Sequence, residues 1–305
     1  MNSSPQRILI ALSGGVDSAV ASYLLKEKGY QVEAVYVRTW ENEKDALGDC
    51  PGAKDLADAK EVAKFLEIPF HVVNFIDFYH QEIVRPMIQG YADGITPNPD
   101  ILCNRKMKFG ALMKYAKNHE FEALATGHYC RKTLGKDGQV QLLEGIDKNK
   151  DQSYFLAQIS KEQLNYALFP LGEMHKEDVR ILAEKIRLPV AKKKDSQGIC
   201  FLGKVKVPQF LSNFIDDQPG EIVTTRGKVV GRHQGLHRYT LGQRKGIGVP
   251  SNTDFENFVV TGKNQEMNQL VVAFEDPKEL TLWGYIYRIE SVFFFNDKFP
   301  TEKIQ

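Results

Sequence analysis

A pair of glycines between an apolar run and a helix-forming run is the first feature of this sequence that could do chemistry. Residues 11–18 read A-L-S-G-G-V-D-S and begin with the last two residues of the apolar run Arg7–Leu12. The glycines let backbone N–H groups turn inward around an anion, and the positive end of a following helix adds to the potential. Ser13 and Ser18 supply hydroxyl donors, and no Lys follows, so this is not a Walker A loop. We predict a phosphate loop; the alternative is a plain turn that Ser18 caps.

Two of the four cysteines lie in basic, turn-forming segments. Cys103 lies in T-P-N-P-D-I-L-C-N-R-K-M-K-F, and Cys200 lies in D-S-Q-G-I-C-F-L-G, shortly after the run Lys192–Lys194. Nearby cations lower the pKa of a thiol and so increase the fraction of reactive thiolate. We interpret both as reactive cysteines on loops, although a lone cysteine is commonly a small buried hydrophobe. Cys50 and Cys130 lack this context, and we interpret them as structural.

Length and composition exclude several classes of protein. The 305 residues are 42% hydrophobic and 26% charged, which is typical of a globular protein of two or three domains. No apolar run approaches the roughly 18–20 residues that cross a bilayer, and the polar start does not resemble a signal peptide. The four cysteines form no CxxC pair, which excludes a zinc finger and a disulfide scaffold. We expect a cytoplasmic protein without a membrane partner.

The net charge of +1 conceals a basic stretch. Residues 192–248 contain 11 Lys or Arg and 4 Asp or Glu. The rest of the chain contains 29 Lys or Arg and 35 Asp or Glu. Such a stretch is either a surface for a polyanion or a solvated face that happens to be basic.

Hydrophobic periodicity predicts alternating strands and helices over the first 130 residues. The predicted strands are Arg7–Leu12, Val32–Val37, Phe70–Phe75 and Phe121–Thr126. The predicted helices are Ser18–Lys28, Asp55–Leu66, Gln81–Tyr91 and Lys106–Lys117. This alternation indicates an α/β fold with a doubly wound parallel sheet, whose ligands bind at the carboxyl ends of the strands.

The pattern changes in the second half of the chain. Short helices are predicted at Lys161–Leu168, Lys176–Ile186 and Pro208–Ile215, and the segment after Pro219 is rich in Gly and β-branched residues. Further strands are predicted at Phe258–Thr261 and Gln269–Phe274, followed by a β-forming run at Tyr285–Phe295. We therefore predict a catalytic domain at 1–160, a small helical domain at 161–217 and a β-barrel-like domain at 218–305 that is cut short.

The loop Ala11–Ser18 resembles the fingerprint of the ATP pyrophosphatases, enzymes of the HUP-like (PP-loop) class that cleave ATP between the α and β phosphates. Five further motifs run in order through the chain. They are P-N-P-D-x-x-C-N, T-G-H-Y at 126–129, K-D-Q-S-Y-F-L at 150–156, D-S-Q-G-I-C-F, and Y-T-L-G-Q-R-K-G-I-G at 239–248. Together they resemble the tRNA-specific 2-thiouridylases, which add sulfur at C2 of the wobble uridine of certain tRNAs.

The resemblance implies that ATP and Mg²⁺ are the cofactors. The residues it places at ATP are Ala11, Leu12, Ser13, Gly14, Gly15, Val16, Asp17, Ser18, Val37 and Gly127. Among them, the carboxylate of Asp17 is the candidate magnesium ligand. Adenylation of the C2 oxygen of uridine would turn a poor leaving group into AMP.

The resemblance also implies the roles of the two cysteines. Cys200 would carry a persulfide and deliver its terminal sulfur to C2, and Cys103 would then release that sulfur and end in a disulfide with Cys200. In an alternative order, Cys103 frees hydrosulfide first. Both orders require the two Cα atoms to approach within about 7 Å at some stage. Asp100 is a candidate proton acceptor or donor, or alternatively a carboxylate that caps the following helix.

The tRNA contacts are implied in the same way. In the family, the positions of Asn98, Pro99 and Asp100 touch the target base, and those of Lys150, Asp151 and Gln152 touch the tRNA. The expected partners are tRNAs of the Glu, Gln and Lys type and a persulfide donor, either a cysteine desulfurase or a sulfur-relay protein. We expect a monomer. The chain ends at Gln305 without an Arg–Tyr pair that family members carry in later barrel strands.

Two other functions fit part of the sequence. A different ATP pyrophosphatase, such as a synthetase that joins an amine to a carbonyl in a small molecule, needs the phosphate loop but neither thiol. A non-catalytic nucleotide-binding module would bind ATP without releasing pyrophosphate. Turnover that persists after substitution of both cysteines would favour the synthetase.

Overall fold

The computed structural model describes residues 6–40, 51–195, 207–250 and 257–274. These residues divide into two compact units. One consists of the described residues up to Val84 together with those from Pro99 to 195, and the other of Arg85–Asn98 together with the described part of Val205–Val292. The domain boundaries predicted at 160 and 217 remain predictions.

The first unit contains a parallel sheet, as the sequence predicts, with five strands instead of the four expected. Its strands, in spatial order, are β3 (Phe70–Asn74), β2 (Gln31–Arg38), β1 (Arg7–Ala11), β4 (Ala123–Ala125) and β7 (Ala167–Leu168). β1 and β2 are buried almost throughout, which is typical of central strands with helices on both faces. The short strand β7 was predicted as the end of a helix.

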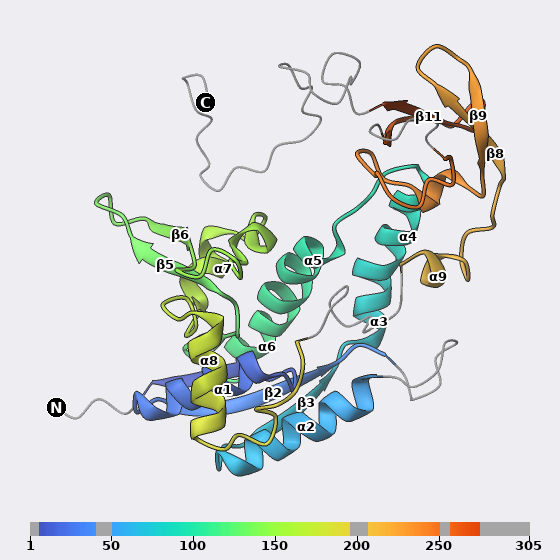
Figure 1. The fold of residues 1–305 in the computed structure, drawn as a ribbon. Helices are drawn as coiled ribbons and strands as arrows, with labels where there is room; N and C mark the ends of the chain where they lie inside the picture. The colour runs from blue at the N-terminus through green and yellow to red at the C-terminus, as the bar shows by residue number, and fades with distance from the viewer. Residues whose placement is uncertain (1–5, 41–50, 196–206, 251–256, 275–305) are drawn as a thin grey trace. The chain divides into compact units, whose positions relative to one another are not determined.

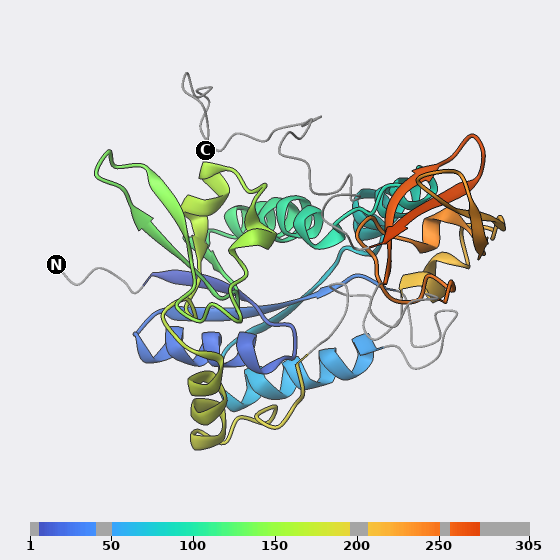
Figure 2. The same cartoon turned by 45° about the horizontal axis from the view of Figure 1, so that its top comes forward.

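Helices cover both faces of this sheet (Figures 1 and 2). On one face lie α1 (Val16–Glu27), α2 (Pro51–Phe65) and α8 (Lys176–Lys185), whose small and branched side chains share one core with the strands. On the other lies the helical stretch of α5 (Pro99–Leu102), the π-helical η2 (Cys103–Leu112) and α6 (Met113–Asn118). The sheet is therefore doubly wound.

Two further parts of this unit extend from the sheet. The hairpin of β5 (Cys130–Leu134) and β6 (Val140–Glu144) was not predicted; it forms a separate two-stranded sheet. It is followed by η3 (Ser153–Leu156) and by α7 (Lys161–Tyr166), which begins with a capping box between Ser160 and Gln163. Cys130 is fully buried in β5, and burial raises the pKa of its thiol, which fits a structural role.

One helical stretch runs from the first unit into the second. It consists of α3 (Ile76–Tyr79), η1 (His80–Val84) and α4 (Arg85–Ala92), where one helix was predicted from Gln81. Within the second unit, the segment after α4 contacts the strands, because the ammonium of Lys263 donates to the carbonyl of Gly94 at 2.9 Å.

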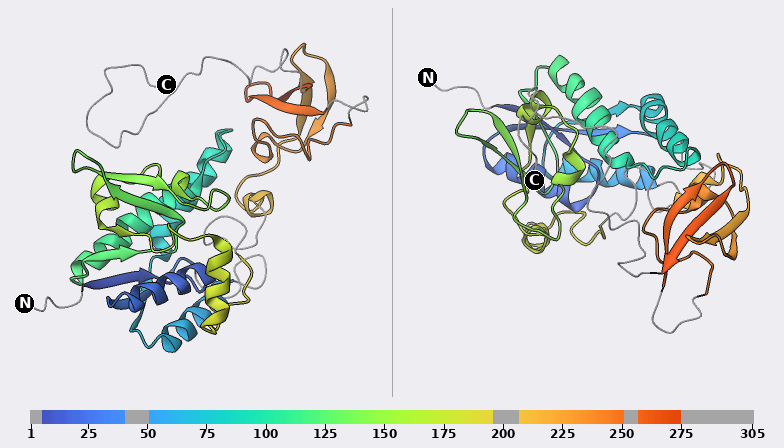
Figure 3. Two further views of the ribbon diagram at one scale, coloured as in Figure 1. Left: turned by 60° about the vertical axis from the view of Figure 1, so that its left-hand side comes forward. Right: turned by 90° about the horizontal axis from the view of Figure 1, so that it is seen from above.

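The second unit contains the predicted β-rich region. Its strands, in spatial order, are β10 (Phe258–Asn264), β11 (Gln269–Phe274), β8 (Gly220–Thr224) and β9 (Val229–His233), drawn in orange to red in Figure 3. Ile222, Val260, Leu270 and Val272 form the centre of its core. The helix α9 (Val207–Leu211) and the turn η4 (Leu236–Arg238) complete it. The run Tyr285–Phe295 lies outside the described residues.

A buried carboxylate joins the first three strands of the parallel sheet. Glu33 of β2 accepts a hydrogen bond from Arg7 of β1 at 2.8 Å and pairs with the Nε2 of His71 of β3 at 2.7 Å. Burial raises the pKa of Glu33, but the hydrogen bonds from Arg7 and His71 outweigh it, so the pKa lies below its usual value.

We expect Glu33→Gln to lower the free energy of unfolding at pH 7 by about 1–3 kcal/mol, because the substitution leaves two partly buried donors poorly paired. A carboxyl with a lowered pKa stabilises the fold above its unfolded pKa and loses that contribution as the pH falls through the folded pKa. The difference between variant and wild type in urea unfolding should therefore shrink as the pH falls below the usual pKa of a glutamate. The exposed Glu61→Gln is the control; an equal pH dependence in both variants would contradict the assignment.

Candidate active site around the phosphate loop

The predicted phosphate loop lies at the point where the order of the sheet reverses. From β1 the chain proceeds to β2 and β3 on one side, whereas β4 and β7 add on the other side. Residues 12–15 follow β1. Gly127 comes two residues after the end of β4, the strand that pairs with β1. Val37 is the penultimate residue of β2. The crevice at the carboxyl ends of strands beside such a reversal is where ligands of this fold class bind.

The hydroxyl of Ser18 forms hydrogen bonds within the loop. Helix α1 begins after Gly15, and no side chain among the described residues caps it, which leaves N–H groups of its first turn directed at the crevice. Ser18 is the third residue of the helix, so the alternative in which it caps the helix is wrong. Its hydroxyl oxygen instead accepts from the N–H of Ser13 at 3.2 Å and donates to the carbonyl of Gly15 at 3.1 Å.

Two glycines allow backbones to meet at the loop. Gly14 has a φ of +77°, and a Cβ there would lie 2.3 Å from the carbonyl oxygen of Asp55 in α2. A Cβ on Gly127 would lie 2.9 Å from the N of Ser18. Neither contact leaves room for a side chain, so the curvature of the loop depends on these two positions.

Lys193 ties the loop to α2 from behind. Its ammonium donates to the carbonyl of Gly14 at 3.0 Å, to Asp55 at 2.7 Å and to Asp58 at 2.5 Å. Burial lowers the pKa of Lys193, but its bonds to the two carboxylates raise the pKa by more. The pKa therefore lies above its usual value, and the side chain stays charged. A half-buried lysine that is paired in this way holds backbone and helix together rather than binding a ligand.

In the first turn of α1, Asp17 faces a lysine and a tyrosine. Lys176, the first residue of α8, donates to both oxygens of its carboxylate at 2.7 and 2.9 Å. The hydroxyl of Tyr129 donates to the same carboxylate at 2.7 Å. Burial, together with the negative charge of Asp17, raises the pKa of Tyr129, so its hydroxyl remains a donor.

The described side chains do not form a magnesium site by themselves. They contain no group of three or more His, Cys, Asp and Glu that could hold a metal ion. The oxygens of Asp17, the predicted ligand, face the ammonium of Lys176. Magnesium is commonly held by one or two carboxylates together with substrate phosphates. The assignment of Asp17 as a metal ligand therefore stays a prediction.

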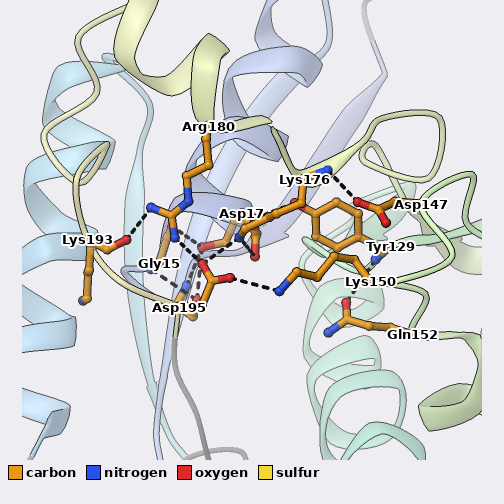
Figure 4. A network of polar contacts seen from close by, with 12 residues as sticks. Gly15, Asp17, Tyr129, Asp147, Lys150, Gln152, Lys176, Arg180, Lys193 and Asp195 are labelled. Carbon is orange, nitrogen blue, oxygen red and sulfur yellow. Dashed lines mark hydrogen bonds and ion pairs between the residues drawn. The ribbon is translucent and has the colours of Figure 1, made fainter. Parts of the chain in front are cut away.

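A second carboxylate lies next to Asp17 (Figure 4). Asp195 pairs with Lys176 at 2.8 Å, with Lys150 at 3.4 Å, and with Arg180 through a short hydrogen bond. Burial raises the pKa of Asp195, but the bonds to Lys176 and Arg180 outweigh it, so the carboxyl is ionised at neutral pH. One lysine thus joins two carboxylates beside the positive end of α1.

The predicted reactive cysteine in the first unit is helical and buried. Cys103 is the first residue of η2 and is 1% exposed, whereas a basic loop was expected. The cause is Pro99, which begins α5; proline favours the first position of a helix. Asp100 lies one helical turn before Cys103 and is half-buried. Cys200, Cys50 and the pairing of Cys103 with Cys200 lie outside the described residues.

The residues expected at tRNA differ in accessibility. Lys150 is exposed, whereas Gln152 accepts from the backbone N–H of Tyr129 at 3.0 Å and Asp151 accepts from Gly145 at 2.8 Å. These two side chains hold the turn that presents Lys150. Pro99 is buried, and Asn98 is half-buried at the end of the segment that belongs to the second unit.

Comparisons with known proteins decide the family. Residues 6–204 match the model of the tRNA methyl transferase HUP domain, and residues 208–274 match that of the tRNA methyl transferase PRC-barrel domain. The tRNA-specific 2-thiouridylase MnmA of Akkermansia muciniphila is 49% identical over 278 residues, which are 91% of this chain and 78% of the relative. That of Pasteurella multocida is 48% identical over 271 residues, 88% of this chain and 70% of the relative. The chain belongs to the MnmA family.

Two solved structures resemble this member of the MnmA family at low sequence identity. A 4-thiouridine synthetase in complex with RNA and bound ATP is 18% identical, with a TM-score of 0.45 over 68% of this chain and 49% of the other. The glutamine-dependent NAD⁺ synthetase of Acinetobacter baumannii is 16% identical, with a TM-score of 0.40. The match covers 62% of this chain and 32% of the synthetase. Likeness at this level says nothing about the substrate.

Several side chains of the MnmA-family site carry no local signal in the sequence. Lys176 meets Asp17 across 159 positions, and Lys193 meets Gly14 across 179. Arg180 is an ordinary surface residue by type, and Asp195 begins the D-S-Q-G-I-C-F motif, which gives no role for its carboxylate. Tyr129 lies in the T-G-H-Y motif, but the motif gives no role for its hydroxyl. Only the fold brings these groups to the phosphate loop.

No described helix is both long enough and apolar enough to span a bilayer.

Proposed function

We propose that this chain is a tRNA-uridine 2-sulfurtransferase that uses ATP to activate C2 of the wobble uridine. The observation that carries the proposal is the phosphate loop at the reversal point of the sheet in a chain of the MnmA family. The loop offers N–H groups, hydroxyls and a helix dipole to a polyphosphate. Membership of the family supports a tRNA as the substrate to be activated.

The first step is adenylation. The C2 oxygen of uridine attacks the α-phosphorus of ATP, the bond to the β-phosphate breaks, and pyrophosphate leaves while AMP stays attached through the former C2 oxygen. The ATP residues proposed above would hold the nucleotide, with Ser13 and the first turn of α1 directed at the phosphates. Magnesium, when bound with ATP, would neutralise part of the phosphate charge.

The second step replaces oxygen by sulfur. The terminal sulfur of a Cys200 persulfide attacks C2, and AMP leaves with the original oxygen. The Cys103 thiolate then attacks the inner sulfur of the resulting disulfide, which frees 2-thiouridine and forms a Cys103–Cys200 disulfide that an external thiol must reduce. In the alternative order, Cys103 attacks the persulfide first and hydrosulfide attacks C2.

Asp100 is proposed to act as a proton acceptor in this series of steps. It lies one helical turn from Cys103 and would accept the thiol proton, because a thiolate is the form that attacks sulfur. The burial of Cys103 supports a step in a pocket from which water is excluded. A base must leave its stack to reach such a pocket, so we propose that the wobble uridine is flipped toward Asn98, Pro99 and Asp100.

The body of the tRNA is proposed to contact exposed cations. Lys150 is presented by a turn that Asp151 and Gln152 hold. The basic stretch from 192 to 248 would add phosphate contacts, whose strength falls as salt is added. We propose tRNAs of the Glu, Gln and Lys type, a persulfide donor such as a cysteine desulfurase or a sulfur-relay protein, a monomeric enzyme and action in the cytoplasm.

Nucleoside mass spectrometry tests the function. Unmodified tRNA with a wobble uridine is incubated with the protein, ATP, magnesium and a desulfurase with cysteine, and reactions without ATP or without the desulfurase are the controls. We expect 2-thiouridine only in the complete reaction. Release of pyrophosphate from ATP that does not depend on tRNA would point instead to a synthetase acting on a small molecule.

A further inference from the structure

The three cations around Asp195 form a site that would suit a phosphate. The side chains of Lys176, Arg180 and Lys150 all point toward the carboxylate of Asp195 in Figure 4. This carboxylate shares the ammonium of Lys176 with Asp17, in the first turn of α1. The carboxylates of Asp17 and Asp195 repel each other, because they share one cation at the positive end of a helix. This repulsion lowers the cost of replacing one of them by another anion.

Of the two carboxylates, Asp17 is the one fixed in place. It belongs to α1, and Tyr129 and Lys176 both donate to it. Asp195 belongs to no helix or strand, although its side chain is as exposed as that of Asp17, at 34%. An incoming anion would therefore displace Asp195 and leave Asp17.

Two of the cations would stay aimed at the same point without Asp195. Arg180 donates through the other terminal nitrogen of its guanidinium to the carbonyl of Ala191 at 3.2 Å and to that of Lys193. Lys176 keeps Asp17, the ring of Tyr129 at 5.8 Å and, through its backbone N–H, the carboxylate of Asp147 at 2.9 Å. Lys150 is held less firmly, at 3.4 Å and 45% exposed, which leaves it available to tRNA.

We infer that Asp195 is an internal counter-ion that stands where the pyrophosphate part of ATP binds, and that Lys176 and Arg180 bind that pyrophosphate once Asp195 is displaced. The inference rests on the proposed use of ATP and adds the residues that recognise its β and γ phosphates. A guanidinium and an ammonium that converge on one point suit a phosphate, and the phosphate loop itself contains no lysine.

Binding of inorganic pyrophosphate, ATP and AMP, measured by calorimetry on the full chain without tRNA, tests the inference. Asp195→Asn removes the competing charge and should tighten the binding of pyrophosphate and ATP about three- to tenfold. Lys176→Gln should weaken both about 10- to 100-fold. AMP lacks the β and γ phosphates, so its affinity should stay unchanged in both variants. Glu184→Gln, an exposed position at the far end of α8, is the control and should match the wild type.

The outcomes separate the inference from the proposed function. Weaker or unchanged pyrophosphate binding by Asp195→Asn would show that Asp195 is only a structural anchor and would overturn the inference, as would unchanged binding by Lys176→Gln. Lys176→Arg should recover most of the pyrophosphate affinity if charge at this point binds the ligand. A wild type that binds ATP but makes no 2-thiouridine would contradict the proposed function alone, whereas a wild type that binds neither ATP nor pyrophosphate would contradict both.

Discussion

Cys200→Ser should lower the formation of 2-thiouridine by at least about a thousandfold while tRNA-dependent release of pyrophosphate continues. The reason is that a hydroxyl cannot carry a persulfide, whereas adenylation requires only the nucleotide site and the uridine. The two rates are measured on the same reaction, by nucleoside mass spectrometry and by a pyrophosphate assay. Cys130→Ala is the matched control: this thiol is fully buried in β5, so its loss should reduce stability and leave sulfur transfer intact.

Cys103→Ser then distinguishes the two orders of the thiol steps. If the persulfide attacks C2 directly, the variant should accumulate tRNA joined to Cys200 through a disulfide, which dithiothreitol releases as 2-thiouridine. If hydrosulfide is freed first, no such adduct forms. Thiolation by Cys200→Ser at more than about a tenth of the wild-type rate would contradict the role of Cys200 in either order.

Gly14→Ala should abolish ATP-dependent pyrophosphate release, with a loss of about a hundredfold or more. The added Cβ would lie 2.3 Å from the carbonyl oxygen of Asp55, so the loop or α2 must move, and small displacements of a binding loop are costly to catalysis. Gly14 also has a φ of +77°, which adds backbone strain.

Gly29→Ala separates these two effects. Gly29 has a φ of +81° but no atom within 4 Å of an added Cβ. Its replacement should cost about 1–2 kcal/mol of stability from backbone strain and leave the release of pyrophosphate unchanged. If Gly14→Ala lost no more activity than Gly29→Ala, the close approach of the loop to α2 would not matter for nucleotide binding.

The sheet was predictable because its strands carry strong, local signals. The runs at β1, β2 and β3 are apolar, β-branched and separated by amphipathic helices, so their type and order follow from the sequence. The two-residue β7 is too short for any periodicity, and its pairing with β4 depends on tertiary contacts. The segment before Cys103 was predicted as a loop because its prolines were interpreted as breakers, although Pro99 begins a helix.

The site was predictable only where it is local. The phosphate loop occupies eight consecutive residues, and its place after a strand was enough to predict an anion site at the carboxyl edge of the sheet. The charges that complete it come from α8 and from the segment that follows α8. Lys176 and Arg180 have no pattern that distinguishes them from solvated surface charges, and the motif that Asp195 begins names no partner for its carboxylate, so their convergence required the fold.

The fate of the C2 oxygen tests the central claim most directly. A tRNA whose wobble uridine carries ¹⁸O at C2 is incubated in ordinary water with the wild-type protein, ATP, magnesium and a desulfurase with cysteine, and the AMP is analysed by mass spectrometry. Activation through adenylation predicts one ¹⁸O in AMP for each 2-thiouridine formed. Formation of 2-thiouridine with unlabelled AMP, or with the label released as water, would contradict the account.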